Sequence, residues 1–222
     1  MGLPTVAMGL LGTLIPLPVA AALLIIPSMV TNVWQLFSGP SFWLILKRLW
    51  LMMIFIIVGT IAGSVFLISI NPKWSSFGLG MALIIYAGYA LFSPLFTVPK
   101  QVEKYLSPFI GIVTGLVTGV TGVFVMPAVP YLQSLNFNKD ELVQALGLSF
   151  TISTIALAIG LYVYGSYKLD QLSLSTFAII PALIGMWIGQ KIRAKISPQR
   201  FRQFFLLFLI VLGLELILKP FF

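Results

Sequence analysis

Polar side chains that could bind a ligand gather in two of the apolar stretches of this chain. They are Ser28, Thr31 and Asn32 in the first stretch, and Gln144, Ser149 and Ser153 in the second. At helical spacing the first three share one face, and the two serines of the second stretch, four residues apart, also share a face. Neutral hydroxyl and amide donors can hold a small oxyanion by hydrogen bonds. Interhelical hydrogen bonding in a membrane is the simpler interpretation of any single one of them.

A glycine-rich string, Gly119-Val120-Thr121-Gly122, predicts a turn that could supply backbone donors to a ligand. Inside a membrane the N–H groups of such a turn need partners, and two opposed helix N-termini would offer theirs to an anion. A similar group of residues occurs near the start of the chain. We therefore predict two opposed tips, with Gly2, Pro4, Thr5, Gly119, Thr121 and Gly122 as binding residues.

The sequence offers few other side chains that could take part in a reaction. The chain has no cysteine and no histidine, which removes disulfides, thiolates and imidazole bases. Asp140 and Glu141 follow Asn138 at a predicted helix start, and Glu215 lies four residues before Lys219 near a helix end. No carboxylate stands out near the middle of a membrane segment as a proton relay. The sequence thus disfavours a membrane enzyme, which needs positioned titratable groups, and implies no metal and no cofactor.

The elements that must position these residues are membrane helices. The chain has 222 residues, of which 59% are hydrophobic and 8% charged, and its mean hydropathy is +1.08. A soluble domain carries about a quarter charged residues. Apolar runs predict full-length helices at residues 17–36, 49–70, 77–96, 141–165, 173–194 and 204–219. We therefore predict an all-α, multi-pass transmembrane bundle in the lipid bilayer. The chain has a net charge of +8, and its basic residues lie in the short segments between the apolar runs. This placement indicates orientation in the membrane and not a nucleic-acid partner.

The two halves of the chain resemble each other. Gly59-x-x-x-Gly63 followed by Ile70-x-Pro72 has the same spacing as Gly185-x-x-x-Gly189 followed by Ile196-x-Pro198. Small residues four apart let helices approach closely, and close packing is also the simpler interpretation of the series Gly111, Gly115 and Gly119. We predict two membrane repeats, residues 1–101 and 102–222. Since Pro108–Val120 has no counterpart, we expect the first repeat to lack the first arm of its hairpin.

The distribution of lysine and arginine favours inverted repeats. If Pro108–Leu135 is a hairpin that returns to its starting side, ten basic residues share one face of the membrane. They are Lys47, Arg48, Lys100, Lys104, Lys139, Lys191, Arg193, Lys195, Arg200 and Arg202, with Lys73, Lys168 and Lys219 on the other face. The positive-inside rule makes the rich face cytoplasmic. Each repeat is then a broken hairpin plus three transmembrane helices, and the odd number of crossings inverts one repeat relative to the other.

Nearly the whole chain resembles the TauE/SafE sulfite exporter family of bacterial and archaeal permeases. The resemblance rests on the hairpin string Gly119-Val-Thr-Gly-Val-Phe-Val-Met-Pro127, on the hydroxyl-rich helix after it, and on Pro181-Ala-Leu-Ile-Gly-Met-Trp-Ile-Gly189 before a basic turn. It implies a multi-pass protein of the cytoplasmic (inner) membrane that transports small sulfur-containing or organic anions, such as sulfite, sulfoacetate or thiosulfate. The family's glycine-rich tips and hydroxyl-bearing helices match Gly2, Pro4, Thr5, Ser28, Gly119, Thr121, Gly122 and Ser149 here.

Two other classes of function stay open at this stage. A membrane-embedded scaffold or subunit without transport activity is the main alternative, and a membrane enzyme is the weaker one. The paired tips and the duplication favour a carrier of small anions. The sequence does not indicate the oligomeric state.

Overall fold

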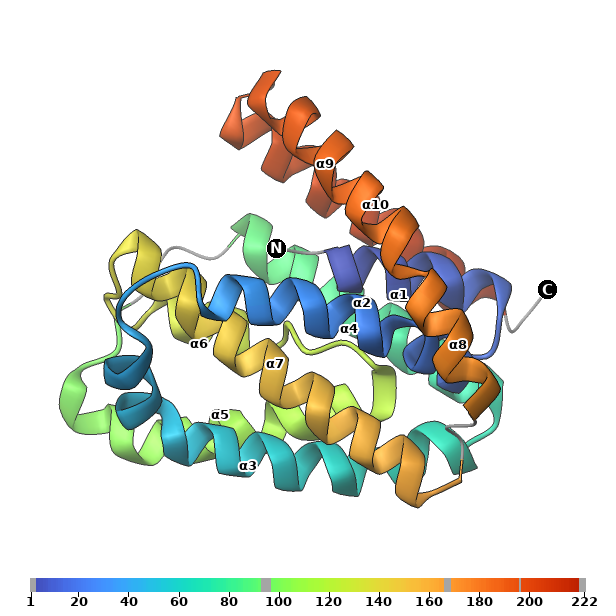
Figure 1. The fold of residues 1–222 in the computed structure, drawn as a ribbon, viewed down its shortest axis with the longest axis horizontal. Helices are drawn as coiled ribbons and strands as arrows, with labels where there is room; N and C mark the ends of the chain where they lie inside the picture. The colour runs from blue at the N-terminus through green and yellow to red at the C-terminus, as the bar shows by residue number, and fades with distance from the viewer. Residues whose placement is uncertain (1–2, 93–96, 166–168, 196, 220–222) are drawn as a thin grey trace.

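The structure is a computed structural model that describes residues 3–92, 97–165, 169–195 and 197–219. These residues form helices and connecting segments and no strand, as predicted (Figure 1). The helices are α1 Leu3–Leu14, α2 Leu17–Leu36, α3 Phe42–Ser69, α4 Pro72–Phe92, α5 Lys100–Thr121, α6 Ala128–Gln133, α7 Lys139–Val163, α8 Leu169–Phe177, α9 Ile179–Lys195 and α10 Pro198–Leu218.

Four of these helices, α2, α3, α4 and α7, are long and apolar enough to cross a membrane. They correspond to the first four predicted spans. The start of α3 lies at Phe42, ahead of the predicted residue 49, because Lys47 and Arg48 belong to the helix and not to the loop before it. The start of α7 follows a capping box, in which Asn138 and Glu141 satisfy each other's backbone N–H groups. This cap accounts for the acidic residues there, as predicted.

The predicted single helix 173–194 is wrong. The chain forms α8 and α9 instead, separated by a turn at Ala178. Pro181 has no N–H to bond the carbonyl of Phe177, so the ladder of helix hydrogen bonds is interrupted at this turn. Beyond it, α9 rises away from the bundle (Figure 1), and most of its described residues are exposed.

Glycines bring α3 and α5 into backbone contact. A Cβ atom added at Gly115 would lie 2.5 Å from the carbonyl oxygen of Ile56, and one at Gly59 would lie 2.5 Å from that of Ile112. Both distances are too short for any side chain. The packing interpretation of the glycine series in α5 is therefore confirmed. The matching string in α9 behaves differently, because a Cβ at Gly185 or Gly189 would meet no described atom within 4 Å.

The segment that contains α5 and α6 is a hairpin. The backbone N–H of Val98 donates to the carbonyl of Ser134 at 3.0 Å, so both ends of the segment lie together. The hydroxyls of Ser107 and Tyr131, 2.6 Å apart, join the two arms farther in. The segment therefore forms a hairpin, as predicted, and its position relative to the two sides of the membrane stays a prediction. The first arm is longer than predicted, since α5 begins at Lys100 and continues through Pro108.

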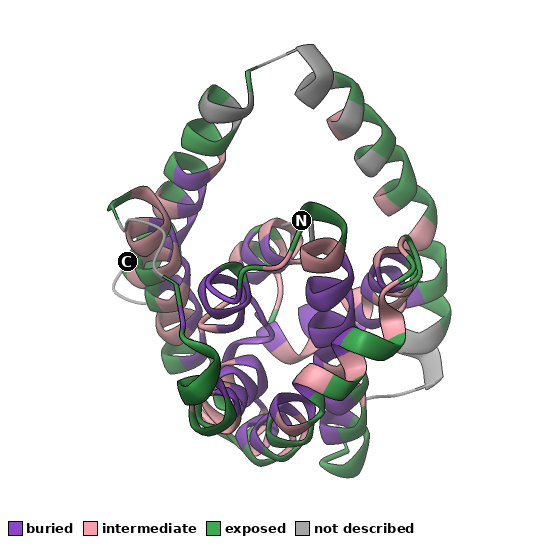
Figure 2. Cartoon of the chain, turned by 90° about the vertical axis from the view of Figure 1, so that its left-hand side faces the viewer, coloured by how far each residue is buried: buried purple, intermediate pink, exposed green. Residues whose placement is uncertain are grey.

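Buried residues face the inside of the bundle, and exposed residues cover its outside (Figure 2). The helices α2 and α7 pack together with Gly147 as the closest point, where an added Cβ would lie 2.5 Å from the backbone nitrogen of Leu36. The helices α4 and α10 pack in the same way at Gly80 and Gly213.

Candidate functional site

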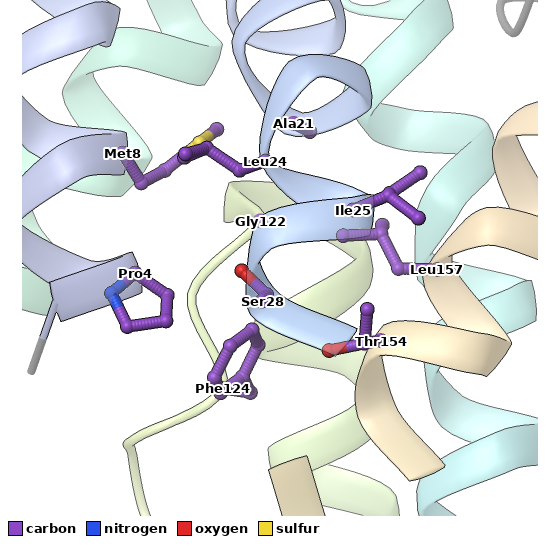
Figure 3. A pocket seen from close by; sticks show the side chains of 10 residues that line it. All are labelled: Pro4, Met8, Ala21, Leu24, Ile25, Ser28, Gly122, Phe124, Thr154 and Leu157. Carbon is purple, nitrogen blue, oxygen red and sulfur yellow. The ribbon is translucent and has the colours of Figure 1, made fainter. Parts of the chain in front are cut away.

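A small cavity lies between the start of α1, the middle of α2, the hairpin tip and α7 (Figure 3). Its walls include Pro4 and Met8 of α1, Ser28 of α2, Gly122 and Phe124 of the tip, and Thr154 of α7. Three of the predicted binding residues, Pro4, Ser28 and Gly122, therefore come together from three separate parts of the chain. No residue of the cavity wall carries a charge.

The cavity is small in this structure. Its volume is about 10 Å³, which is room for about one water molecule. An oxyanion of four heavy atoms is larger than one water molecule, so the cavity must widen to hold it.

Ser28 supplies the polar group of the cavity. The residue is 3% exposed, and its hydroxyl forms no hydrogen bond within the described part of the chain. Figure 3 shows this hydroxyl pointing into the space near Pro4 and Gly122. Buried hydroxyls in proteins are nearly always bonded. A hydroxyl that has no protein partner and faces a small uncharged cavity is available to a water molecule or a ligand there.

The hairpin tip at Gly122 is the C-terminal end of α5, and not the helix N-terminus predicted from the sequence, so it leaves one backbone donor, not a set of them. Gly122 has a φ of +72° and ends α5, with its N–H donating to the carbonyl of Thr118 at 2.7 Å. The hydroxyl of Thr121 donates to the carbonyl of Val117 and accepts the N–H of Val123. Thr121 thus shapes the tip and does not offer its hydroxyl to the cavity. The next N–H, that of Phe124, forms no hydrogen bond with any described residue.

Asn32 and Thr154 join α2 to α7 beside the cavity. The side-chain amide of Asn32 donates to the hydroxyl of Thr154 at 3.3 Å, and that hydroxyl donates in turn to the carbonyl of Phe150 at 2.7 Å. The hydroxyl proton of Thr154 is therefore already donated to a hydrogen bond within α7. Its contribution to the cavity is shape together with an oxygen that accepts hydrogen bonds.

Thr5 is also close to this region. It lies one residue after Pro4, is 2% exposed, and its hydroxyl has no hydrogen-bond partner among the described residues. It does not line the cavity as it stands.

The other predicted binding residues lie outside the cavity wall. Gln144 accepts the N–H of Ser41 at 2.9 Å and donates to the carbonyls of Leu36 and Gly39 at 2.8 and 2.7 Å, so it holds the loop between α2 and α3. Thr31 donates its hydroxyl to carbonyls of its own helix. Gly119 packs against the carbonyl of Thr60 in the interface between α3 and α5.

Ser149 and Ser153 form a separate case. Both are fully buried in α7, and neither hydroxyl has a hydrogen-bond partner in the described structure, but neither residue lines the cavity. Gly2 lies outside the described residues.

Phe124 and Thr154 line the cavity but are not among the residues predicted from the sequence. A signal for Thr154 exists in the spacing of small residues on α7. Gly147, Thr151 and Thr154 follow at i, i+4 and i+7 and therefore share one face. Since Gly147 contacts α2 directly, this face turns toward α2 and the cavity. No comparable local signal marks Phe124, which packs against Phe150 with ring centroids 4.9 Å apart.

Comparison with family models decides the family. The model described as "Sulfite exporter TauE/SafE" matches residues 1–216. The chain belongs to the TauE/SafE sulfite exporter family. The resemblance found in the hairpin and glycine strings is thereby confirmed. No curated protein and no solved structure matches the chain.

TauE/SafE proteins form a family of membrane sulfite exporters and permeases. The four long apolar helices agree with membrane embedding. For this TauE/SafE chain the family gives the class of function, a carrier for small anions.

Proposed function

We propose that this chain carries a small oxyanion, such as sulfite, sulfoacetate or thiosulfate, across the inner cell membrane and binds it in the cavity at Ser28. The observation that carries the proposal is the Ser28 hydroxyl, which has no hydrogen-bond partner in the described structure and points into a small, uncharged cavity between the start of α1 and the hairpin tip. The family match supports sulfite as the first anion to test.

The binding chemistry follows from neutral donors. Ser28 donates a hydroxyl proton, and the N–H of Phe124 at the tip donates from the backbone. Hydrogen bonds from neutral donors to an anion are stronger than those between neutral groups, because the acceptor is charged. They also avoid the desolvation of a fixed cationic side chain inside the membrane. Such a site binds an anion without holding it so tightly that it cannot leave.

Transport requires the cavity to open toward each side of the membrane in turn. The hairpin tip and the start of α1 are the natural moving parts, because both end in the middle of the bundle and meet at the cavity. The inverted-repeat arrangement, residues 1–101 and 102–222, would make these two segments equivalent. Opening at one of them would then expose the site to one face of the membrane, and opening at the other would expose it to the opposite face.

The glycine face of α9 supports a second candidate function. Gly185 and Gly189 meet no described atom within 4 Å, and Trp187 and Ile188 beside them are exposed. A scaffold subunit would use such a face to receive another membrane helix. A scaffold does not need the cavity at Ser28, so the carrier remains the proposal.

Uptake of radiolabelled sulfite into proteoliposomes tests the carrier against the scaffold. We expect saturable uptake that protein-free liposomes lack, and competition by unlabelled sulfoacetate or thiosulfate if these anions share the site. Uptake equal to that of protein-free liposomes, for all three anions and for both orientations of the gradient, would contradict the proposal.

A further inference from the structure

The hydrogen-bond ladder of α2 lacks one bond directly before Ser28, and we call this place the broken turn of α2. Pro27 lies inside the helix and has no N–H to offer the carbonyl of Leu23, four residues earlier. Within a membrane an unpaired carbonyl costs several kcal/mol, so it takes a partner from a neighbouring helix or from water.

Ser175 of α8 supplies that partner. Its hydroxyl donates to the carbonyl of Leu23 at 2.9 Å and accepts the backbone N–H of Ile26 at 3.2 Å. Ser175 is completely buried, although the residues around it on α8 are mostly exposed. One side chain thus satisfies both backbone groups of the broken turn.

The break and the cavity are adjacent. Leu24, Ile25 and Ser28 line the cavity, and the two groups bonded by Ser175 belong to the same turn of α2. Since the hydroxyl of Ser28 has no hydrogen bond of its own in the described structure, its direction depends on the backbone that carries it.

We propose that Ser175 is a positioning residue, which fixes the broken turn of α2 and thereby aims the Ser28 hydroxyl into the anion cavity. The inference rests on the proposed function for its effect on transport, but its geometric content is independent of any anion. Without the Ser175 hydroxyl, the turn between Leu23 and Pro27 takes up other hydrogen bonds, and Ser28 moves with it.

A thiol probe at position 28 tests the geometry alone. The chain has no cysteine, so Ser28→Cys places its only thiol at the cavity. We expect the rate of modification by a small methanethiosulfonate reagent to change severalfold when Ser175→Ala is added. The matched control is Ser64→Ala, which removes another buried serine hydroxyl, bonded only to Thr60 of its own helix, and should leave the rate unchanged. Equal rates with and without Ser175→Ala would overturn the proposal.

Sulfite transport tests how Ser175 acts. We expect Ser175→Ala to raise the KM for sulfite about tenfold, the effect of losing roughly one hydrogen bond, with little change in the amount of folded protein. In the double variant with Ser28→Ala, the KM should equal that of Ser28→Ala alone, because Ser175 acts through Ser28. Independent, multiplying effects of the two substitutions would overturn the proposal. If wild-type protein transports no anion, the proposed function fails, and the thiol rates still decide the geometry.

Discussion

Arg48 of α3 donates two hydrogen bonds to the carboxylate of Glu103 on α5, at 2.6 and 2.8 Å. The same guanidinium donates to the carbonyl of Leu135 at 3.0 Å and lies 4.5 Å from the ring centroid of Phe137. Arg48 therefore links α3 to both ends of the hairpin, near Glu103 at its start and at Leu135 at its finish. We call these two ends the base of the hairpin. This tie leaves the tip of the hairpin, and not its base, as the part that can move.

Removal of the carboxylate should loosen this base. We expect Glu103→Ala to lower the free energy of unfolding by about 1.5–3 kcal/mol, because the partly buried guanidinium loses a charged partner. The thermal midpoint of the purified protein in detergent measures it. Glu215→Gln is the control: Glu215 is exposed near the end of α10, so its change should stay within about 0.5 kcal/mol. Equal midpoints for both variants would show that the ion pair does not stabilise the fold.

The glycine contact between α3 and α5 predicts a sharp contrast between similar substitutions. A methyl group at Gly115 would lie 2.5 to 2.8 Å from backbone atoms of α3, which cannot yield without separating the helices. We expect Gly115→Ala to destabilise the protein by about 1–3 kcal/mol, a typical cost of overpacking. Gly88→Ala on α4 meets nothing within 4 Å and should be neutral or slightly stabilising. Thermal unfolding of the pair would refute this packing if Gly115→Ala were as stable as Gly88→Ala.

Gln144 provides a test of structural against ligand-binding roles. Gln144→Glu keeps an acceptor for the N–H of Ser41 but cannot donate to the carbonyls of Leu36 and Gly39. We expect a loss of stability of about 1–3 kcal/mol from these unpaired buried groups, with the KM for sulfite unchanged in the folded protein. A raised KM for sulfite with unchanged stability would contradict this structural role and would show that Gln144 contributes to anion binding.

Membrane orientation follows from the distribution of basic residues. Single cysteines introduced at Lys100 and Arg200 should be labelled only from the cytoplasm, and those at Lys73 and Lys168 only from outside, because the basic face stays inside. The closed hairpin base at Val98 and Ser134 agrees with this arrangement. Impermeant maleimide applied to intact cells measures it, with lysed cells as the control. Labelling of positions 73 and 200 from the same side would overturn the inverted-repeat model.

The parts of the fold that the sequence predicts are those with local causes. The run from Leu17 to Leu36 is mostly apolar and is followed by a Ser-Gly-Pro segment, so its span was predictable to the residue. The break at Ala178 was missed although its cause, Pro181, is visible in the sequence. Proline inside membrane helices is often tolerated, and only packing decides whether the chain bends or separates into two helices.

The candidate site was predicted in part for a similar reason. Pro4, Ser28 and Gly122 were found because tips and isolated polar residues stand out in an apolar chain. Gln144 stands out equally, but its partners lie about a hundred residues away in a loop, and no local pattern reveals them. Whether Ser153 or Thr154 faces the cavity depends on the rotation of α7 about its axis. That rotation is set by the contact of Gly147 with α2.

The KM for sulfite of Ser28→Ala in proteoliposomes tests the central claim most directly. We expect a rise of about tenfold to hundredfold, the effect of losing one hydrogen bond to a charged ligand, with an unchanged thermal midpoint because the hydroxyl has no partner within the described structure. Ser64→Ala, a buried serine remote from the cavity wall, should keep the wild-type KM. Wild-type KM in Ser28→Ala would contradict the claim that the anion binds in this cavity.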